Sequence, residues 1–145
     1  MDNQNHPSTQ LQRLACCLDQ LLELLDQERT ALTERNTDLL AETAEQKLSL
    51  VTEVSHYDLV ALTDEIRALP AEEQQECDAL HSSVVQSAQA VRDSNLVNGM
   101  IVRRTQQSTS ELLRILSGKP RNGLYGTTGS PVEGRETTAA TIAKA

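Results

Sequence analysis

Residues 11–32 read LQRLACCLDQLLELLDQERTAL, a leucine-rich stretch with no glycine and no proline. Its leucines recur at alternating steps of three and four, and Glu28 stands at the one position of the series that lacks a leucine. That spacing is typical of a coiled-coil seam, and flanking Ala and Leu residues widen it into the apolar stripe of a bundle helix. Thr9, with Gln12 three residues later, resembles a capping box. The stretch predicts a packed amphipathic helix from Thr9 to Arg35.

Two further segments repeat this spacing. Asn36 or Thr37 is the expected cap of a second helix, and residues 56–58 are its weakest stretch, where a local irregularity would fall. Pro70 suits the start of a third helix, where its missing N–H needs no partner, and Gly118 is placed to end that helix. The sequence therefore predicts an all-α antiparallel bundle of three long helices, at Thr9–Arg35, Thr37–Leu69 and Pro70–Ser117.

The composition supports helices and separates a tail. The 145 residues include no Phe, no Trp and two Tyr, so a β-sandwich or barrel is disfavoured. Residues 118–145 include five Gly, five Thr and one Ser and lack any helical or strand pattern. We expect a helical domain over residues 1–117 and a flexible tail over residues 118–145.

Charge, cysteines and hydropathy limit the class of protein. Residues 1–80 carry 17 acidic and 5 basic groups, residues 81–145 carry 4 acidic and 8 basic groups, and the net charge is −8. This balance argues against nucleic-acid binding, which needs a basic face.

Three cysteines, two of them adjacent, form no disulfide framework and fit a reducing compartment. No apolar run suggests a signal peptide or a membrane span, so we expect a cytoplasmic protein.

The third predicted helix is longer than the second, so its last part, from about Val102, is expected to extend beyond the turn at Thr37. That part is rich in apolar residues, and a monomer seldom leaves such a surface uncovered. A second copy, a bent-back segment or a partner would cover it. The expected contact face comprises Ile101, Val102, Thr105, Thr109, Leu112, Leu113 and Leu116.

Two other groups of residues have alternative interpretations. Asn95, Asn98 and Gly99 inside the third helix indicate a mild kink, a close helix approach or a hinge. Ser87, Ser94 and Asn98 make the middle of its seam polar, which predicts weaker packing there and suits an exchange of partners.

Cys77 and His81 have metal-ligand spacing, but no complementary pair of ligands is evident, so a packed cysteine beside a surface histidine is the simpler interpretation. No catalytic constellation is recognisable. We therefore expect no enzyme activity, no cofactor and no metal.

The order of these features resembles the FlgN family of flagellar type III export chaperones. The shared features are the leucine-rich first helix, the segment EQKLSL at residues 45–50, Asn95-Leu96-Val97-Asn98-Gly99, the apolar helix end, and Leu124-Tyr125-Gly126-Thr127-Thr128-Gly129 in the tail. The lack of aromatic residues elsewhere is a departure from the family.

The resemblance implies a helical cytoplasmic chaperone that binds hook-associated proteins 1 and 3 and delivers them to the export gate. It implies that Leu124, Tyr125 and Gly126 dock to the cytoplasmic domain of the export-gate membrane protein, and it links the family to the export stalk protein. Two alternatives remain: a coiled-coil scaffold or weak homodimer without a client, and a metal- or redox-dependent regulator that uses Cys77 and His81.

Overall fold

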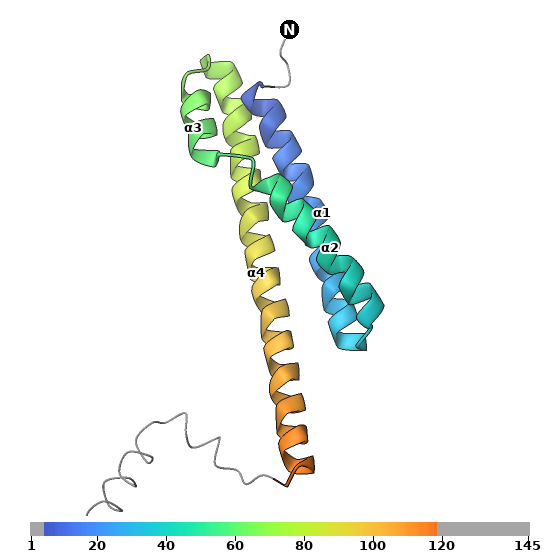
Figure 1. Cartoon of the computed structure of the whole chain (residues 1–145). Helices are drawn as coiled ribbons and strands as arrows, with labels where there is room; N and C mark the ends of the chain where they lie inside the picture. The colour runs from blue at the N-terminus through green and yellow to red at the C-terminus, as the bar shows by residue number, and fades with distance from the viewer. Residues whose placement is uncertain (1–4, 119–145) are drawn as a thin grey trace, which may run out of the picture. The chain divides into compact units, whose positions relative to one another are not determined.

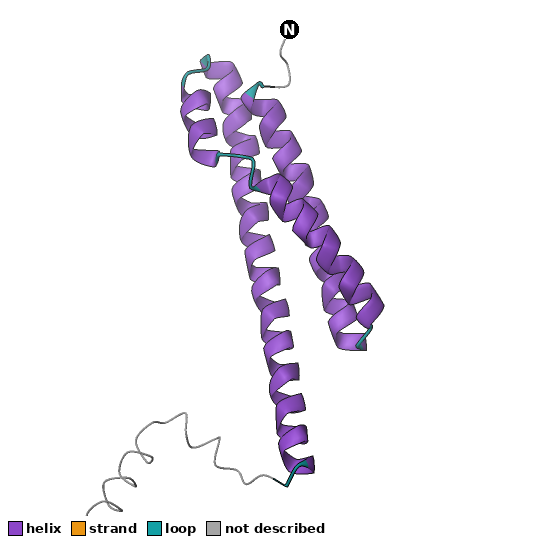
Figure 2. Cartoon of the chain, viewed as in Figure 1, coloured by secondary structure: helices purple, strands orange, loops and turns teal. Residues whose placement is uncertain are grey.

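The computed structural model describes residues 5–118, and the regular structure in that range is entirely helical (Figures 1 and 2). Four helices follow one another, α1 (Pro7–Glu34), α2 (Thr37–Val54), α3 (Leu59–Arg67) and α4 (Ala71–Leu116). The predicted all-α class is confirmed. The predicted tail, apart from Gly118, lies outside the described residues.

The chain divides into two units, Met1–Arg103 and Arg104–Ala145, and the division falls within α4. The first unit holds α1, α2, α3 and most of α4. The described part of the second unit is the end of α4 with the two residues that follow it. The predicted boundary between residues 117 and 118 follows composition rather than packing, and it stays a prediction.

The start of α1 differs from the prediction. The helix begins at Pro7, with His6 as its N-cap, and the His6 ring nitrogen accepts a hydrogen bond from the backbone N–H of Ser8 at 3.3 Å. Proline is well suited to a first helical position because it has no N–H to satisfy. Thr9 therefore lies inside the helix and does not cap it.

The second predicted helix is divided in two at the stretch that looked weakest. α2 begins after its predicted cap Asn36, which accepts the N–H of Leu39 at 3.1 Å, and it ends at Val54. The Asp58 carboxylate then caps α3 by accepting the N–H groups of residues 60 and 61 at 3.0 and 3.1 Å. An aspartate that satisfies free backbone donors in this way favours a new helix start over a continuous helix.

α4 spans 46 residues without a break. It starts directly after Pro70, and Glu72 and Glu73 lie in its first turn, where the helix dipole favours anions. At its other end, Gly118 has a φ of 67° and its N–H donates to the Ile115 carbonyl oxygen at 3.1 Å. This left-handed conformation suits glycine and closes the helix where the sequence predicted.

The core of the first unit lies along α1, between α2 and α4 and against α3 (Figure 1). One cluster of buried residues joins Leu11, Leu14, Leu18, Leu62, Ile66, Cys77 and Val84. A smaller cluster joins Leu21, Leu24 and Leu25, and Val91 of α4 packs against both clusters. Within residues 5–118, no helix combines the length and apolar character that a membrane span requires.

Candidate functional site

The last turns of α4 expose an unusual number of large apolar side chains. Leu112, Leu113, Ile115 and Leu116 are 57%, 62%, 61% and 75% exposed. Single exposed apolar residues are ordinary on protein surfaces, whereas a contiguous group of them is typical of a protein-binding surface. These exposed side chains form a candidate binding surface at the helix end where the sequence predicted one.

The other residues of the predicted client-binding face divide between the two units. Ile101 is half-buried and Val102 is 37% exposed, and both belong to the first unit. Thr105 and Thr109 lie in the second unit and are exposed, and their spacing places them on the helix face of Leu112 and Leu116. The predicted set omitted Ile115, although it is as exposed as its neighbours. The client-binding role of this face stays a prediction.

The predicted gate-docking residues Leu124, Tyr125 and Gly126 lie outside the described residues. Their role stays a prediction that rests on the sequence.

The three candidate hinge residues have different surroundings. α4 continues through all of them, and Asn95 is exposed whereas Asn98 is only 2% exposed. A Cβ atom added at Gly99 would meet no atom within 4 Å, so no close helix approach requires a glycine there. The hinge itself stays a prediction, but Asn98 has a further role within the first unit.

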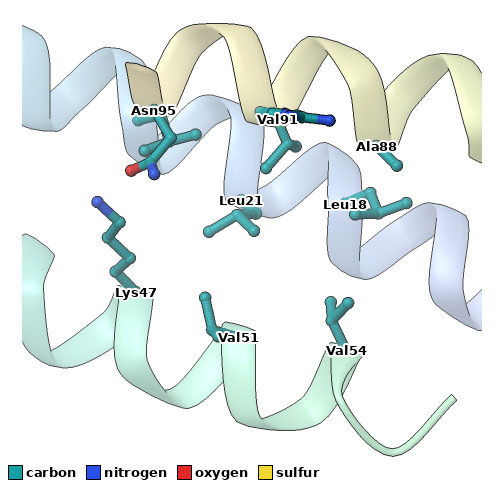
Figure 3. A pocket seen from close by; sticks show the side chains of 10 residues that line it. Leu18, Leu21, Lys47, Val51, Val54, Ala88, Val91 and Asn95 are labelled. Carbon is teal, nitrogen blue, oxygen red and sulfur yellow. The ribbon is translucent and has the colours of Figure 1, made fainter. Parts of the chain in front are cut away.

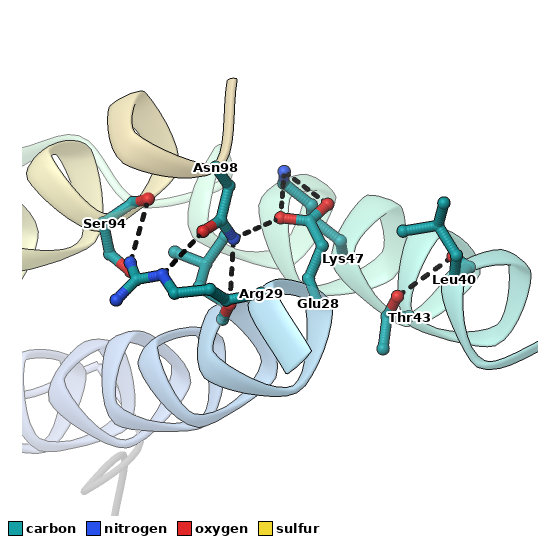
Figure 4. A network of polar contacts seen from close by, with 8 residues as sticks. Glu28, Arg29, Leu40, Thr43, Lys47, Ser94 and Asn98 are labelled. Carbon is teal, nitrogen blue, oxygen red and sulfur yellow. Dashed lines mark hydrogen bonds and ion pairs between the residues drawn. The ribbon is translucent and has the colours of Figure 1, made fainter. Parts of the chain in front are cut away.

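The side-chain amide of Asn98 joins α4 to α1 (Figure 4). Its Nδ2 donates to the Leu25 carbonyl oxygen at 2.8 Å and to Glu28 Oε2 at 2.7 Å. Its Oδ1 accepts a hydrogen bond from Arg29 Nε at 3.0 Å. Both ends of the amide are therefore bonded to α1, and two of the three partners are charged, which makes such bonds about twice as strong as neutral ones.

Two further contacts extend this network to a second point on α4 and to α2 (Figure 4). Arg29 Nη2 donates to Ser94 Oγ at 2.8 Å, one helical turn before Asn98. Lys47 Nζ donates to Glu28 Oε1 at 3.1 Å, and the side chains of Lys47 and Glu28 are only 28% and 13% exposed. A partly buried set of charges thus links α1, α2 and α4.

This network involves the polar positions that interrupt the apolar seams of the sequence. Glu28 interrupts the seam of the first helix, while Ser94 and Asn98 make the seam of α4 polar. Ser94 and Asn98 predicted weak packing, but in the structure both accept hydrogen bonds from Arg29, and Asn98 also donates to Glu28. Among the described residues, no buried side-chain nitrogen or oxygen lacks a hydrogen-bond partner. The polar middle of α4 is therefore a satisfied contact within the bundle.

Cys77 and His81 have separate local roles. Cys77 is 1% exposed within the larger apolar cluster, and His81 Nε2 lies 3.3 Å from Thr63 Oγ1. Burial raises the pKa of the Cys77 thiol, and burial with the nearby Glu53 carboxylate raises the pKa of Cys17 to about 11. A raised pKa keeps a thiol protonated, whereas metal binding and redox chemistry need the thiolate. Residues 5–118 contain no group of three or more metal-ligating side chains.

Together, a helical bundle and a helix end rich in exposed leucines define a class of helical protein whose surface is suited to binding another protein. A family model, described as FlgN protein, matches residues 1–133. No curated protein and no solved structure matches the chain. Because the family model covers most of its length, the chain belongs to the FlgN family, which is a family of flagellar export chaperones.

Replacing Asn98 by Ala is expected to lower the free energy of unfolding by about 2–4 kcal/mol. The change leaves the Leu25 carbonyl and the charged Arg29 and Glu28 groups short of a partner, and each buried unsatisfied group costs about 1–3 kcal/mol. Urea denaturation followed by circular dichroism measures the effect. Asn95→Ala, at an exposed asparagine on the same helix, is the matched control and should change the value by less than about 0.5 kcal/mol. Equal effects of the two variants would contradict a structural role for the network.

Gly99→Ala is expected to raise the free energy of unfolding by about 0.5–1 kcal/mol, since alanine favours the helix and its Cβ meets open space. The reverse change at an exposed position of the same helix, Ala90→Gly, should lower the free energy by a similar amount. If Gly99 is a hinge, the stabilised variant will also bind its client more weakly. A destabilised Gly99→Ala variant would show that the glycine is structurally required.

Proposed function

We propose that this chain is a cytoplasmic chaperone that binds hook-associated proteins 1 and 3 before export and delivers them to the flagellar export gate. Membership of the FlgN family supports the general role. The site of client binding in this proposal is the C-terminal part of α4, on the predicted face that ends at Leu112, Leu113 and Leu116, together with the exposed Ile115.

The exposure of those four residues carries the proposal. A helix presented with its apolar side chains already in place can bind an amphipathic helix of a client through anchors spaced three and four residues apart. Each leucine that a client covers contributes roughly 1.5–3 kcal/mol. When no client is present, a second copy of the chain covers the same face as a weak homodimer.

Delivery is assigned to a different part of the chain. Leu124, Tyr125 and Gly126 bind the cytoplasmic domain of the export-gate membrane protein, and the export stalk protein is a further partner. A tyrosine supplies a flat apolar ring with one hydroxyl, which suits a small pocket. The separation of client binding from gate docking lets the chaperone hold its cargo while it engages the gate.

The double variant Leu112→Ser with Leu116→Ser is expected to weaken binding of purified hook-associated protein 1 at least 100-fold. The loss of two apolar anchors accounts for about 3 kcal/mol or more, and every 1.4 kcal/mol corresponds to a factor of ten in Kd. Isothermal titration calorimetry measures the affinity.

The matched control changes the opposite face of the same helical segment, with Gln107→Ser and Ser110→Ala. It should leave the affinity unchanged, and both variants should keep the helical content and unfolding midpoint of the parent chain. A double leucine variant that binds the client as tightly as the parent would refute the proposed site.

Tyr125→Ala is expected to leave client affinity unchanged while binding to the cytoplasmic domain of the export-gate protein falls at least tenfold. The truncation removes the one aromatic anchor of the tail but touches none of the residues assigned to the client. Val132→Ala, another apolar truncation in the tail, serves as the control and should retain gate binding. Loss of client binding, or retention of both activities in Tyr125→Ala, would show that the two functions are not divided in this way.

A further inference from the structure

The first unit contains a hollow of about 280 Å³ that the bundle does not fill (Figure 3). Its floor is α1, and its walls are α2 on one side and α4 on the other. Side chains from the three helices face one another across it, among them Leu18, Leu21, Val51, Val54, Ala88 and Val91. All of these residues precede Arg103 and belong to the first unit, whereas the leucines assigned to the client belong to the second unit.

The dimensions of the hollow favour side chains over a small molecule. Sites for drug-sized ligands usually have volumes of about 300–1,000 Å³, and this hollow is smaller. The hollow opens to solvent beside Val51 of α2, which is 47% exposed. The lining residues run from Lys47 to Val54 on α2 and from Ala88 to Asn95 on α4, about 10 Å or roughly two turns along each helix. An apolar groove of this length suits one face of an α-helix.

The basic residues at the groove favour an occupant that carries acidic side chains. Lys47 and Arg92 line it, although the chain as a whole carries a net charge of −8. Lys47 is paired with Glu28, whereas Arg92 is exposed and forms no ion pair with any acidic side chain of residues 5–118. A helix that inserts apolar side chains beside Arg92 gains an ion pair if it carries a carboxylate there.

The same charge disfavours this chain's own last segment as the occupant. Residues 119–145 contain four basic and two acidic residues, so their net charge is positive, the same sign as Arg92 at the groove, while the charge of Lys47 is already offset by Glu28. A separate acidic helix is therefore the better complement.

From these observations we infer that the groove between α2 and α4 is a second docking site, which receives about two turns of an acidic amphipathic helix from another protein. Leu, Ile or Met side chains of that helix fill the hollow against Leu21, Val51 and Val91. A Glu or Asp at its edge pairs with Arg92. This site acts independently of the client face at the end of α4.

The test uses the full-length chain and two designed helical peptides with the same leucine face, one flanked by Glu and the other by Lys. Fluorescence anisotropy of the labelled peptides is expected to show at least tenfold tighter binding of the Glu peptide. Arg92→Glu should reverse this preference, and Val51→Asp should weaken the Glu peptide at least tenfold. Val51→Ser, a milder change at the same half-exposed position, serves the same purpose if Val51→Asp does not fold.

Independence of the two sites is tested with the same variants. Arg92→Glu should bind hook-associated protein 1 like the parent, and Leu112→Ser with Leu116→Ser should bind the Glu peptide like the parent. Loss of the Glu peptide in the double leucine variant would place its binding at the helix end and overturn the proposal.

Three further outcomes would overturn it. The first is failure of the Glu peptide to bind, or equal binding of both peptides. The second is displacement of the Glu peptide by a synthetic peptide of residues 119–145, which would make the chain's own segment the occupant. The third is a dimer in sedimentation experiments that Val51→Asp dissociates, which would make a second copy the occupant.

Discussion

The buried amide of Asn98 is the contact on which the register of the first unit depends. Apolar seams with a heptad spacing fit one another nearly as well after a slip of seven residues, or about 10 Å. A slip of that size would separate Asn98, which is 2% exposed, from the Leu25 carbonyl and from Arg29, and it would leave a buried amide without these partners. A polar residue at a seam position is the best-attested means of fixing one register among several apolar alternatives. The same residues also reach α2, because Glu28 binds both Asn98 and Lys47.

The hollow beside this network follows from the size of the side chains. The bundle has no Phe or Trp with which to fill the space between its helices, and the apolar residues in the α2 and α4 walls of the hollow are three valines and one alanine. The network holds α1, α2 and α4 together at residues 28, 47 and 98, where polar contacts rather than apolar packing determine the spacing. Next to that point, Val51 and Val91 do not bridge the remaining distance (Figure 3). The hollow thus results from polar contacts that determine the helix spacing and from neighbouring apolar side chains that are too small to fill it.

Periodicity was enough to predict the all-α class and the approximate extent of α1 and α4, because apolar spacing alone reports which face of a helix is buried. Periodicity did not show that α2 and α3 are separate helices, because Leu62 and Ile66 still face the core after the break. The decisive feature was the carboxylate of Asp58, whose capping bonds depend on local backbone geometry rather than on spacing. The polar seam positions were visible in the sequence as well. Their mutual pairing was not, because two polar residues 70 positions apart can be matched only when the register of their helices is known.

The end of α4 is stabilised by local contacts rather than by burial of its apolar side chains. Within the second unit, Arg114 and Glu111 form an ion pair at 2.7 Å across one turn, and Gly118 satisfies a terminal carbonyl in its left-handed conformation. Such contacts support a helix end locally, without burial of its apolar side chains. The leucines of this segment therefore remain exposed in the folded chain, and the free energy of burying them is still available when a partner binds. Because the segment is already helical, a partner that docks there avoids much of the entropic cost of ordering a flexible chain.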